Sequence, residues 1–329
     1  MTRPRPSSVT ALVAAALSLA LVAGCGGSDN GTGSRSRPAP PAADFPSAKG
    51  KTLRQILLES GGHQGPVVSP AAAKFYVGTN RFPFGIFTPA RQQISDAQVA
   101  LYAAPGRGVD GPAIGPFPAR IEDLTTKSAF RAQSTSSDPN AAQVAYVSDI
   151  SFDKPGQWEF AALIKNGSSY EASLLPAPSP VGDYPSPRVG QPAPAVHTVT
   201  AGEVSSITQI DTRVPPDDMH SDDLADVLGK KPVVLLFATP ALCQSRVCGP
   251  VTDIAEQVKQ TYGDRVAFIH QEVYNNNQIR DGIRPQLRAY RLTTEPWCFV
   301  IDRSGRVSTV LQGPFSVQEL QAAVQKVAA

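Results

Sequence analysis

The sequence is poor in the residue types on which several classes of protein depend. Only four of its 329 residues are cysteine, four are histidine and two are methionine. So few cysteines cannot form the disulfide framework of a small secreted scaffold. Charged residues make up only 18% of the chain, the net charge is +2, and no basic run is interleaved with aromatic side chains. We therefore expect no nucleic-acid partner.

A long apolar run lies close to the N-terminus, from Val9 to Val22, behind two arginines. Its length suits the apolar part of a signal peptide better than a helix that spans a membrane. The small residues that follow lead directly to Cys25, and Val22-Ala23-Gly24-Cys25 resembles the lipobox of bacterial lipoproteins. The resemblance implies cleavage before Cys25 and a lipid on its thiol, and two or more acyl chains anchor a protein stably.

These features predict a signal peptide over residues 1–24 and a lipid-anchored protein on the extracytoplasmic face of the cell membrane. In the alternative, an ordinary secretory signal, Cys25 has no special role. Exported chains meet conditions in which disulfides persist, and three cysteines remain: Cys243, Cys248 and Cys298. An isolated close pair in such a chain indicates a redox couple or a stabilising disulfide.

Two segments that have little to bury divide the mature chain. Residues 25–45 are rich in glycine, serine and proline, which is typical of a disordered tether. Seven prolines lie between Pro176 and Pro194, too many for a helix or a central strand. We therefore place a linker at residues 177–195, which leaves one domain over 46–176 and a second over 196–329.

The first domain shows the patterns of short β-strands. Expected strands cover residues 74–87, 98–102, 143–152, 158–165 and 170–175. Apolar side chains alternate along the fourth of these, and Asn166-Gly167 is a hairpin signal. Between Asp153 and Trp158, a proline and a glycine come shortly before an aromatic residue that starts a strand, and this pattern resembles that of small extracytoplasmic immunoglobulin-like domains. We expect an all-β immunoglobulin-like sandwich with its core from about residue 65, a short helix near Leu53–Leu58, and a binding or spacer role.

The second domain holds the residues that could carry out a chemical reaction. An apolar run from Lys231 to Ala238 predicts a strand that is covered on both faces. Cys243 and Cys248 follow it, and apolar residues at helical spacing begin at Val251. The cysteines thus lie between the end of a strand and the start of a helix. Sites collect there in α/β sheets, and a helix N-terminus lowers the pKa of a thiol.

Strands and helices alternate through the rest of the chain. Expected strands cover residues 265–273, 297–302 and 306–311, with a helical segment at 285–291 and a last helix behind the capping box Ser316-Val317-Gln318-Glu319. This order is similar to that of thioredoxin-like proteins from about residue 190 onward, and Gly190-Gln191-Pro192-Ala193-Pro194 resembles the start of redoxin domains. The resemblance implies an α/β thioredoxin-like fold, in which Pro296 matches the cis-proline that faces the reactive cysteine.

The usual Cys-x-x-Cys is absent, and two alignments remain open. Cys248-Gly249-Pro250-Val251 overlays the Cys-Gly-Pro-Cys of thioredoxins, which makes Cys248 the attacking thiol. Thr239-Pro240 before Cys243, with Cys248 five residues further on, resembles Q-type peroxiredoxins, in which the first cysteine attacks and the second resolves. We favour Cys243 as the attacker, because it lies six residues after Phe237, close to the distance seen in the family, whereas Cys248 lies eleven after it.

A disulfide between Cys243 and Cys248 requires a non-helical chain between them. Residues five apart on a helix have Cα atoms roughly 8 to 9 Å apart, beyond the reach of a disulfide. Pro250 disfavours a helical conformation for the residue before it and itself suits a first helical turn. We therefore expect a loop at residues 243–247 and a disulfide between the two cysteines; the alternative is two unpaired thiols.

We expect a membrane-anchored thiol-disulfide oxidoreductase that acts on disulfides of a protein partner through Cys243, Cys248 and Pro296, with no cofactor and no metal. Cys298 is expected to be a buried core thiol. The first alternative is a thiol peroxidase, although Arg246 and Arg291 do not lie at the position of the peroxiredoxin arginine.

Two further alternatives remain. A copper-delivery protein would need His220 or His270 beside the cysteines, and Met219 is the one methionine of the mature chain. A redox-inert thioredoxin-like module would serve, with the sandwich, as a surface interaction protein.

Overall fold

The computed structural model describes residues 1–2 and 35–328. Cys25 and the remainder of the expected signal peptide lie outside the described residues. Within the described part of the chain, no helix combines the length and the apolar character needed to cross a membrane. Residues 35–328 group into one compact unit.

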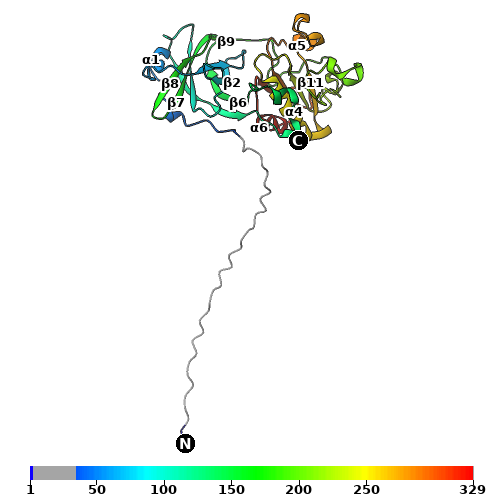
Figure 1. The fold of residues 1–329 in the computed structure, drawn as a ribbon, viewed down its shortest axis with the longest axis horizontal. Helices are drawn as coiled ribbons and strands as arrows, with labels where there is room; N and C mark the ends of the chain where they lie inside the picture. Colours follow the sequence, from blue (N-terminus) through cyan, green and yellow to red (C-terminus); the bar gives the residue numbers. More distant parts are fainter. Residues whose placement is uncertain (3–34, 329) are drawn as a thin grey trace. The chain divides into compact units, whose positions relative to one another are not determined.

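Two antiparallel sheets form the first part of this unit (Figure 1). One sheet has the order β1–β2–β6–β5, with bounds Val67–Pro70, Gly78–Phe87, Val144–Phe152 and Arg120–Asp123. The other has the order β4–β3–β7–β8, with bounds Ile114–Pro118, Val99–Pro105, Gly156–Asn166 and Ser169–Leu174, and β9 (Ser179–Val181) also pairs with β7. The expected all-β character is confirmed, and the immunoglobulin-like assignment stays a prediction.

The sandwich buries both faces of its second sheet. Phe82 and Phe84 of the first sheet share a core with Phe160 of β7. On the opposite face of β7, Leu163 packs with the helix α1 (Leu53–Leu58), which has the expected bounds. Because α1 covers this face, the central residues of β7 are buried on both sides rather than alternately.

Several boundaries differ from the expectations. The tether was expected to reach residue 45, but Arg37 pairs with Ile121 and Phe45 is buried, so its last residues belong to the folded unit. The expected linker contains β9, which pairs with the start of β7. The strands β1, β4, β5 and β9 were not expected. They are only three to five residues long, and β1, β4 and β9 contain prolines, which sheets tolerate at their edges.

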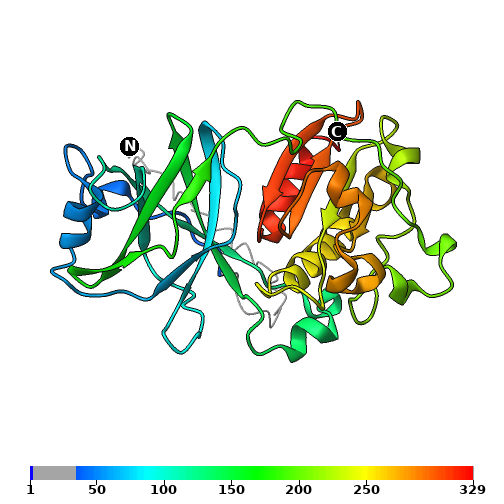
Figure 2. The same cartoon turned by 90° about the horizontal axis from the view of Figure 1, so that it is seen from above.

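A four-stranded sheet of order β11–β10–β12–β13 forms the second part, with bounds Ala267–Gln271, Val233–Phe237, Trp297–Ile301 and Val307–Gln312. β10 is parallel to β11 and antiparallel to β12. The helices α4 (Cys248–Tyr262) and α6 (Val317–Gln325) pack on one face, and Leu287 of α5 (Pro285–Ala289) packs on the other. This β-α-β-α-β-β-α connection confirms the thioredoxin-like fold. Figure 2 shows these yellow-to-red elements gathered apart from the blue-to-green strands.

The two parts share a polar and apolar interface. Leu124 and Ala145 of the sandwich belong to the same buried cluster as Val251 of α4. Arg81 of β2 donates to the carboxylate of Glu319 on α6, at 2.7 Å, and Arg120 donates to the same group. Burial raises the pKa of Glu319, but the two guanidinium groups outweigh it and hold that pKa below its ordinary value. The interface therefore includes a partly buried ion-pair network.

Candidate functional site

The two cysteines lie where the chain passes from β10 to α4. Backbone N–H groups of Leu242 and Cys243 donate to the carbonyl of Thr239, so the chain turns directly after the strand. The helix α4 begins at Cys248 itself, three residues before its expected start. Residues 243–247 are non-helical, as expected. The expected disulfide is absent, because the thiols of Cys243 and Cys248 are both free.

The three described cysteines differ in exposure. Cys243 is partly exposed, whereas Cys248 and Cys298 are fully buried. Cys298 lies on β12 opposite Leu236, within the core under α4, and burial raises the pKa of its thiol. Its place confirms the expected core thiol.

The surroundings of Cys243 favour its thiolate. The hydrogen bond from the Cys248 thiol has the largest effect on the pKa of Cys243; burial opposes it, and the Ser245 hydroxyl and two backbone N–H groups add to it. Together they lower this pKa to about 6. Burial raises the pKa of Cys248 well above its ordinary value, and the neighbouring Cys243 raises it further. The site therefore pairs an accessible thiolate with a buried, protonated thiol.

A carboxyl group and the expected cis-proline lie beside this pair. The Glu295-Pro296 peptide bond is cis. Burial raises the pKa of Glu295, and the charge of Cys243 raises it further, while Glu295 in turn raises the pKa of Cys248. Glu295 is thus a carboxyl group within electrostatic reach of both thiols.

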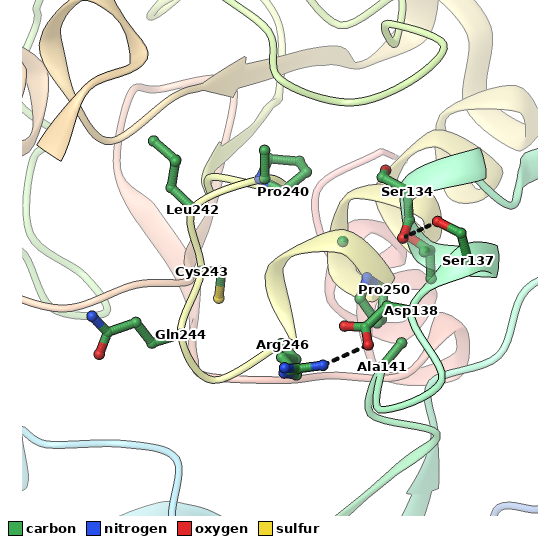
Figure 3. A pocket seen from close by; sticks show the side chains of 13 residues that line it. Ser134, Ser137, Asp138, Ala141, Pro240, Leu242, Cys243, Gln244, Arg246 and Pro250 are labelled. Atoms are coloured by element: carbon green, nitrogen blue, oxygen red, sulfur yellow. Dashed lines mark hydrogen bonds and ion pairs between the residues drawn. The ribbon is translucent and has the colours of Figure 1, made fainter.

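Cys243 opens into a pocket of about 660 Å³ that both parts of the chain line. One wall is the loop after β10, and the other is α2 (Gln133–Ser137), which lies in the β5–β6 loop, residues 124–143 (Figure 3). A Cβ at Gly249 would lie only 2.8 Å from Oγ1 of Thr135, so α4 and α2 approach closely. The sequence places this loop within the expected sandwich domain and gives no local sign of its role in the pocket.

Buried polar contacts hold the β5–β6 loop against the second part. Arg213 donates to Oδ1 of Asp253 on α4 at 2.9 Å, and also to the carbonyl of Phe130. The other oxygen of Asp253 accepts from the backbone N–H of Ala132. These contacts are buried or partly buried, and they hold the wall of the pocket in place in the reduced protein.

Of the two arginines considered for peroxide binding, Arg246 lines the pocket of Cys243 and Arg291 is exposed. Arg246 donates to Asp138 of the β5–β6 loop at 2.6 Å (Figure 3). The backbone carbonyl of Arg291 accepts from the side chains of Lys74 and Ser186. The hydroxyl of Thr239 is buried and has no hydrogen-bond partner among the described residues.

The low pKa of Cys243 predicts a pH profile for its alkylation by iodoacetamide. The thiolate is the reacting form, so the rate should rise with a midpoint near pH 6 and level off above pH 7. An ordinary cysteine has its midpoint near pH 8.5. Rates measured on Cys298→Ala, with Cys243→Ser as the blank, test this. A midpoint of 8 or above would contradict the described surroundings of the thiol.

The histidines do not join the thiols. His270 lies on β11 and hydrogen-bonds to Asp217 and to the carbonyl of Ala238, and His220 lies beside Asp211 and Asp217. The copper-delivery alternative therefore lacks the histidine that it needs beside the cysteine pair. The sequence could not show this grouping, because His270 is fifty residues from His220 and only the fold brings them together.

Two solved structures are similar to part of the chain. A thiol:disulfide interchange protein of the thioredoxin family from Chlorobium tepidum TLS is 22% identical, and the match covers 45% of this chain and 100% of that chain with a TM-score of 0.30. A thioredoxin-like superfamily protein is 19% identical, over 33% of this chain and 86% of its own, with a TM-score of 0.27. No known family model matches the sequence, and neither does any curated protein. Because these identities and TM-scores are low, the assignment of a thioredoxin-like fold rests on the strand order of the second part.

Proposed function

We propose that the protein is a thiol-disulfide oxidoreductase that acts on disulfides of other proteins. The observation that carries the proposal is the asymmetry of the cysteine pair. Cys243 is accessible and its pKa is lowered to about 6, whereas Cys248 is buried and its pKa is raised. This is the division between an attacking and a resolving thiol.

The reaction follows from these roles. The Cys243 thiolate attacks one sulfur of the substrate disulfide, that S–S bond breaks, and one substrate thiolate leaves. Cys248 loses its proton, for which Glu295 is the neighbouring acceptor, and attacks the Cys243 sulfur. The second substrate thiolate leaves, the substrate is reduced, and a Cys243–Cys248 disulfide forms. The reverse sequence oxidises a dithiol.

The pocket suits a protein substrate. Its wall at α2 carries serine and threonine side chains, and the loop before α4 carries Gln244 and Arg246, all of which can hydrogen-bond to a peptide backbone. Pro296 would hold that backbone beside the sulfurs. The β5–β6 loop gives the sandwich a share in choosing the partner.

Parallel assays of insulin reduction with dithiothreitol and of hydrogen peroxide consumption test the proposal. We expect catalysed insulin reduction and peroxide consumption no faster than that of free cysteine. Peroxide consumption without insulin reduction would instead support the peroxidase alternative. Neither activity, together with a disulfide that resists a glutathione buffer, would support the inert module.

We also propose that a lipid on Cys25 anchors the protein to the extracytoplasmic face of the cell membrane. The lipobox resemblance of residues 22–25 supports this. In a bacterial host, a radiolabelled fatty acid should be incorporated into the wild type and not into Cys25→Ser. Equal incorporation of the label into both proteins would contradict the proposal.

A further inference from the structure

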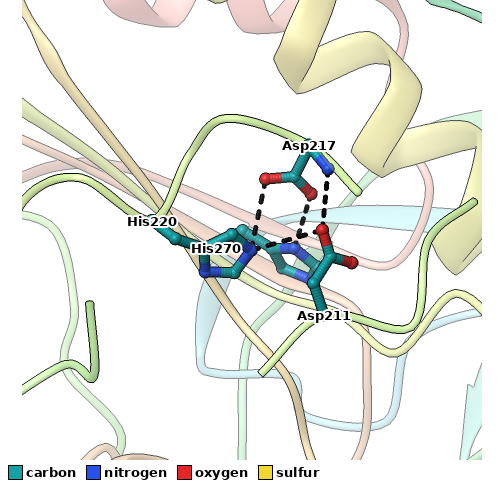
Figure 4. A group of neighbouring side chains, drawn as sticks. All are labelled: Asp211, Asp217, His220 and His270. Atoms are coloured by element: carbon teal, nitrogen blue, oxygen red, sulfur yellow. Dashed lines mark hydrogen bonds and ion pairs between the residues drawn. The ribbon is translucent and has the colours of Figure 1, made fainter. Parts of the chain in front are cut away.

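Four titratable side chains meet in the interior of the second part, apart from the thiols. Asp211, Asp217 and His220 come from the segment before β10, and His270 comes from β11 (Figure 4). One potential metal-ligand atom from each lies within 4.8 Å of the others. Each side chain is at most 6% exposed. Two carboxylates and two imidazoles are therefore buried in one place.

Backbone hydrogen bonds hold the two carboxylates in place. Oδ1 of Asp211 accepts from the N–H of Arg213, and Oδ2 accepts from the N–H of Asp217. Oδ1 of Asp217 accepts from the N–H of Met219, whose own carbonyl accepts from the N–H of His270. The segment and β11 are thus locked together, and the carboxylates keep lone pairs directed at the imidazoles.

His270 is oriented as a metal ligand is. Its Nε2 lies 3.2 Å from the carbonyl of Ala238, which can only accept, so Nε2 carries a hydrogen. Its Nδ1 faces the cluster, 2.8 Å from Oδ2 of Asp217. Histidines that bind metals commonly donate their other N–H to a backbone carbonyl in this way, which fixes the ring.

His220 supplies the independent evidence. It is only 2% exposed, yet neither of its ring nitrogens has a hydrogen-bond partner within the described part of the chain. Its Nε2 lies 3.3 Å from Oδ1 of Asp217 and 3.4 Å from Oδ2 of Asp211. A tetrahedral site with bonds of about 2.0 to 2.1 Å places its ligand atoms about 3.3 to 3.4 Å apart. The two spacings of His220 match that geometry, whereas Nδ1 of His270 and Oδ2 of Asp217, which are 2.8 Å apart, would have to move apart to hold an ion. Buried polar atoms are rarely left without a partner.

We propose that Asp211, Asp217, His220 and His270 form a structural site for a divalent cation of the zinc type. The two carboxylates balance the charge of the ion when both imidazoles are neutral. A set of two nitrogens and two oxygens suits zinc better than calcium or magnesium, which prefer oxygen alone. Four protein ligands leave no open position, so the ion would stabilise the fold and take no part in chemistry.

Zinc content of the untagged chain tests the site. Protein is unfolded in chelator, refolded with or without zinc sulfate, desalted, and measured by elemental analysis and thermal unfolding. We expect one zinc per chain and a higher Tm for the zinc-loaded protein. Cobalt should replace zinc and give the intense visible absorption of a tetrahedral site. Less than 0.1 zinc per chain in the wild type would overturn the proposal.

Three variants locate the metal. His220→Ala should lose the zinc, and His197→Ala, which changes an exposed histidine, should keep it. Cys243→Ser should also keep it, because the thiols are not ligands of this site. Zinc that is lost with Cys243 or retained in folded His220→Ala would refute the assignment. If His220→Ala does not fold, the cobalt spectrum of the wild type decides, because thiolate ligands give a distinct charge-transfer band.

Discussion

Cys243→Ser is expected to lower insulin reduction by at least about a thousandfold, to the uncatalysed rate. The thiolate of Cys243 is the group that forms the first bond to the substrate, and a serine hydroxyl is not ionised at neutral pH. Cys248 cannot substitute for it, because its thiol is fully buried and has a raised pKa. Initial rates with dithiothreitol as the reductant measure the effect.

Cys298→Ala is the matched control for this variant. It removes a fully buried thiol that lies in the core under α4, away from the pocket, so activity should stay within about threefold of the wild type. A Cys243→Ser protein that retains a tenth of the wild-type activity, or a Cys298→Ala protein that is equally impaired while folded, would contradict the assigned roles.

Gly313→Ala is expected to destabilise the protein by about 2 to 5 kcal/mol and to lower its Tm by about 5 to 15 °C. Gly313 has a φ of +75°, and a Cβ there would lie 2.2 Å from the backbone oxygen of Ala71 in the sandwich. The clash forces the two parts of the chain to separate locally. The N–H of Gly313 also donates to the carbonyl of Pro296 at 2.9 Å, so activity should fall as well.

Gly229→Ala is the control that separates the steric clash with Ala71 from the cost of a positive φ at a residue other than glycine. Gly229 has nearly the same φ, +78°, and a Cβ there meets nothing within 4 Å. Thermal unfolding of both variants should therefore show a small loss of Tm for Gly229→Ala and a much larger one for Gly313→Ala. Equal losses would mean that the contact with Ala71 does not contribute to the coupling between the two parts.

The sequence predicted the elements that have strong local signals. The apolar run to Ala238, the Ser316 capping box and the cis-proline at Pro296 all appear in the structure. The strand β4 was missed because Pro116 and Pro118 break the usual pattern, although an edge strand tolerates them.

The features that were missed depend on contacts between distant residues. Asp138 lies 108 residues before Arg246, and no local pattern indicates that the β5–β6 loop would form a wall of the pocket. The asymmetry of Cys243 and Cys248 likewise depends on burial, which the spacing alone does not give. Sequence patterns could therefore name the thiols but not their surroundings.

Trapping the mixed disulfide tests the central claim most directly. Reduced Cys248→Ser is mixed with insulin, quenched with acid, and analysed by intact mass and peptide mapping. Our account predicts an adduct that dithiothreitol releases and that maps to Cys243, and no comparable adduct for Cys243→Ser. An adduct on Cys248 in Cys243→Ser, formed at least as fast, would contradict the assignment of Cys243 as the attacking thiol.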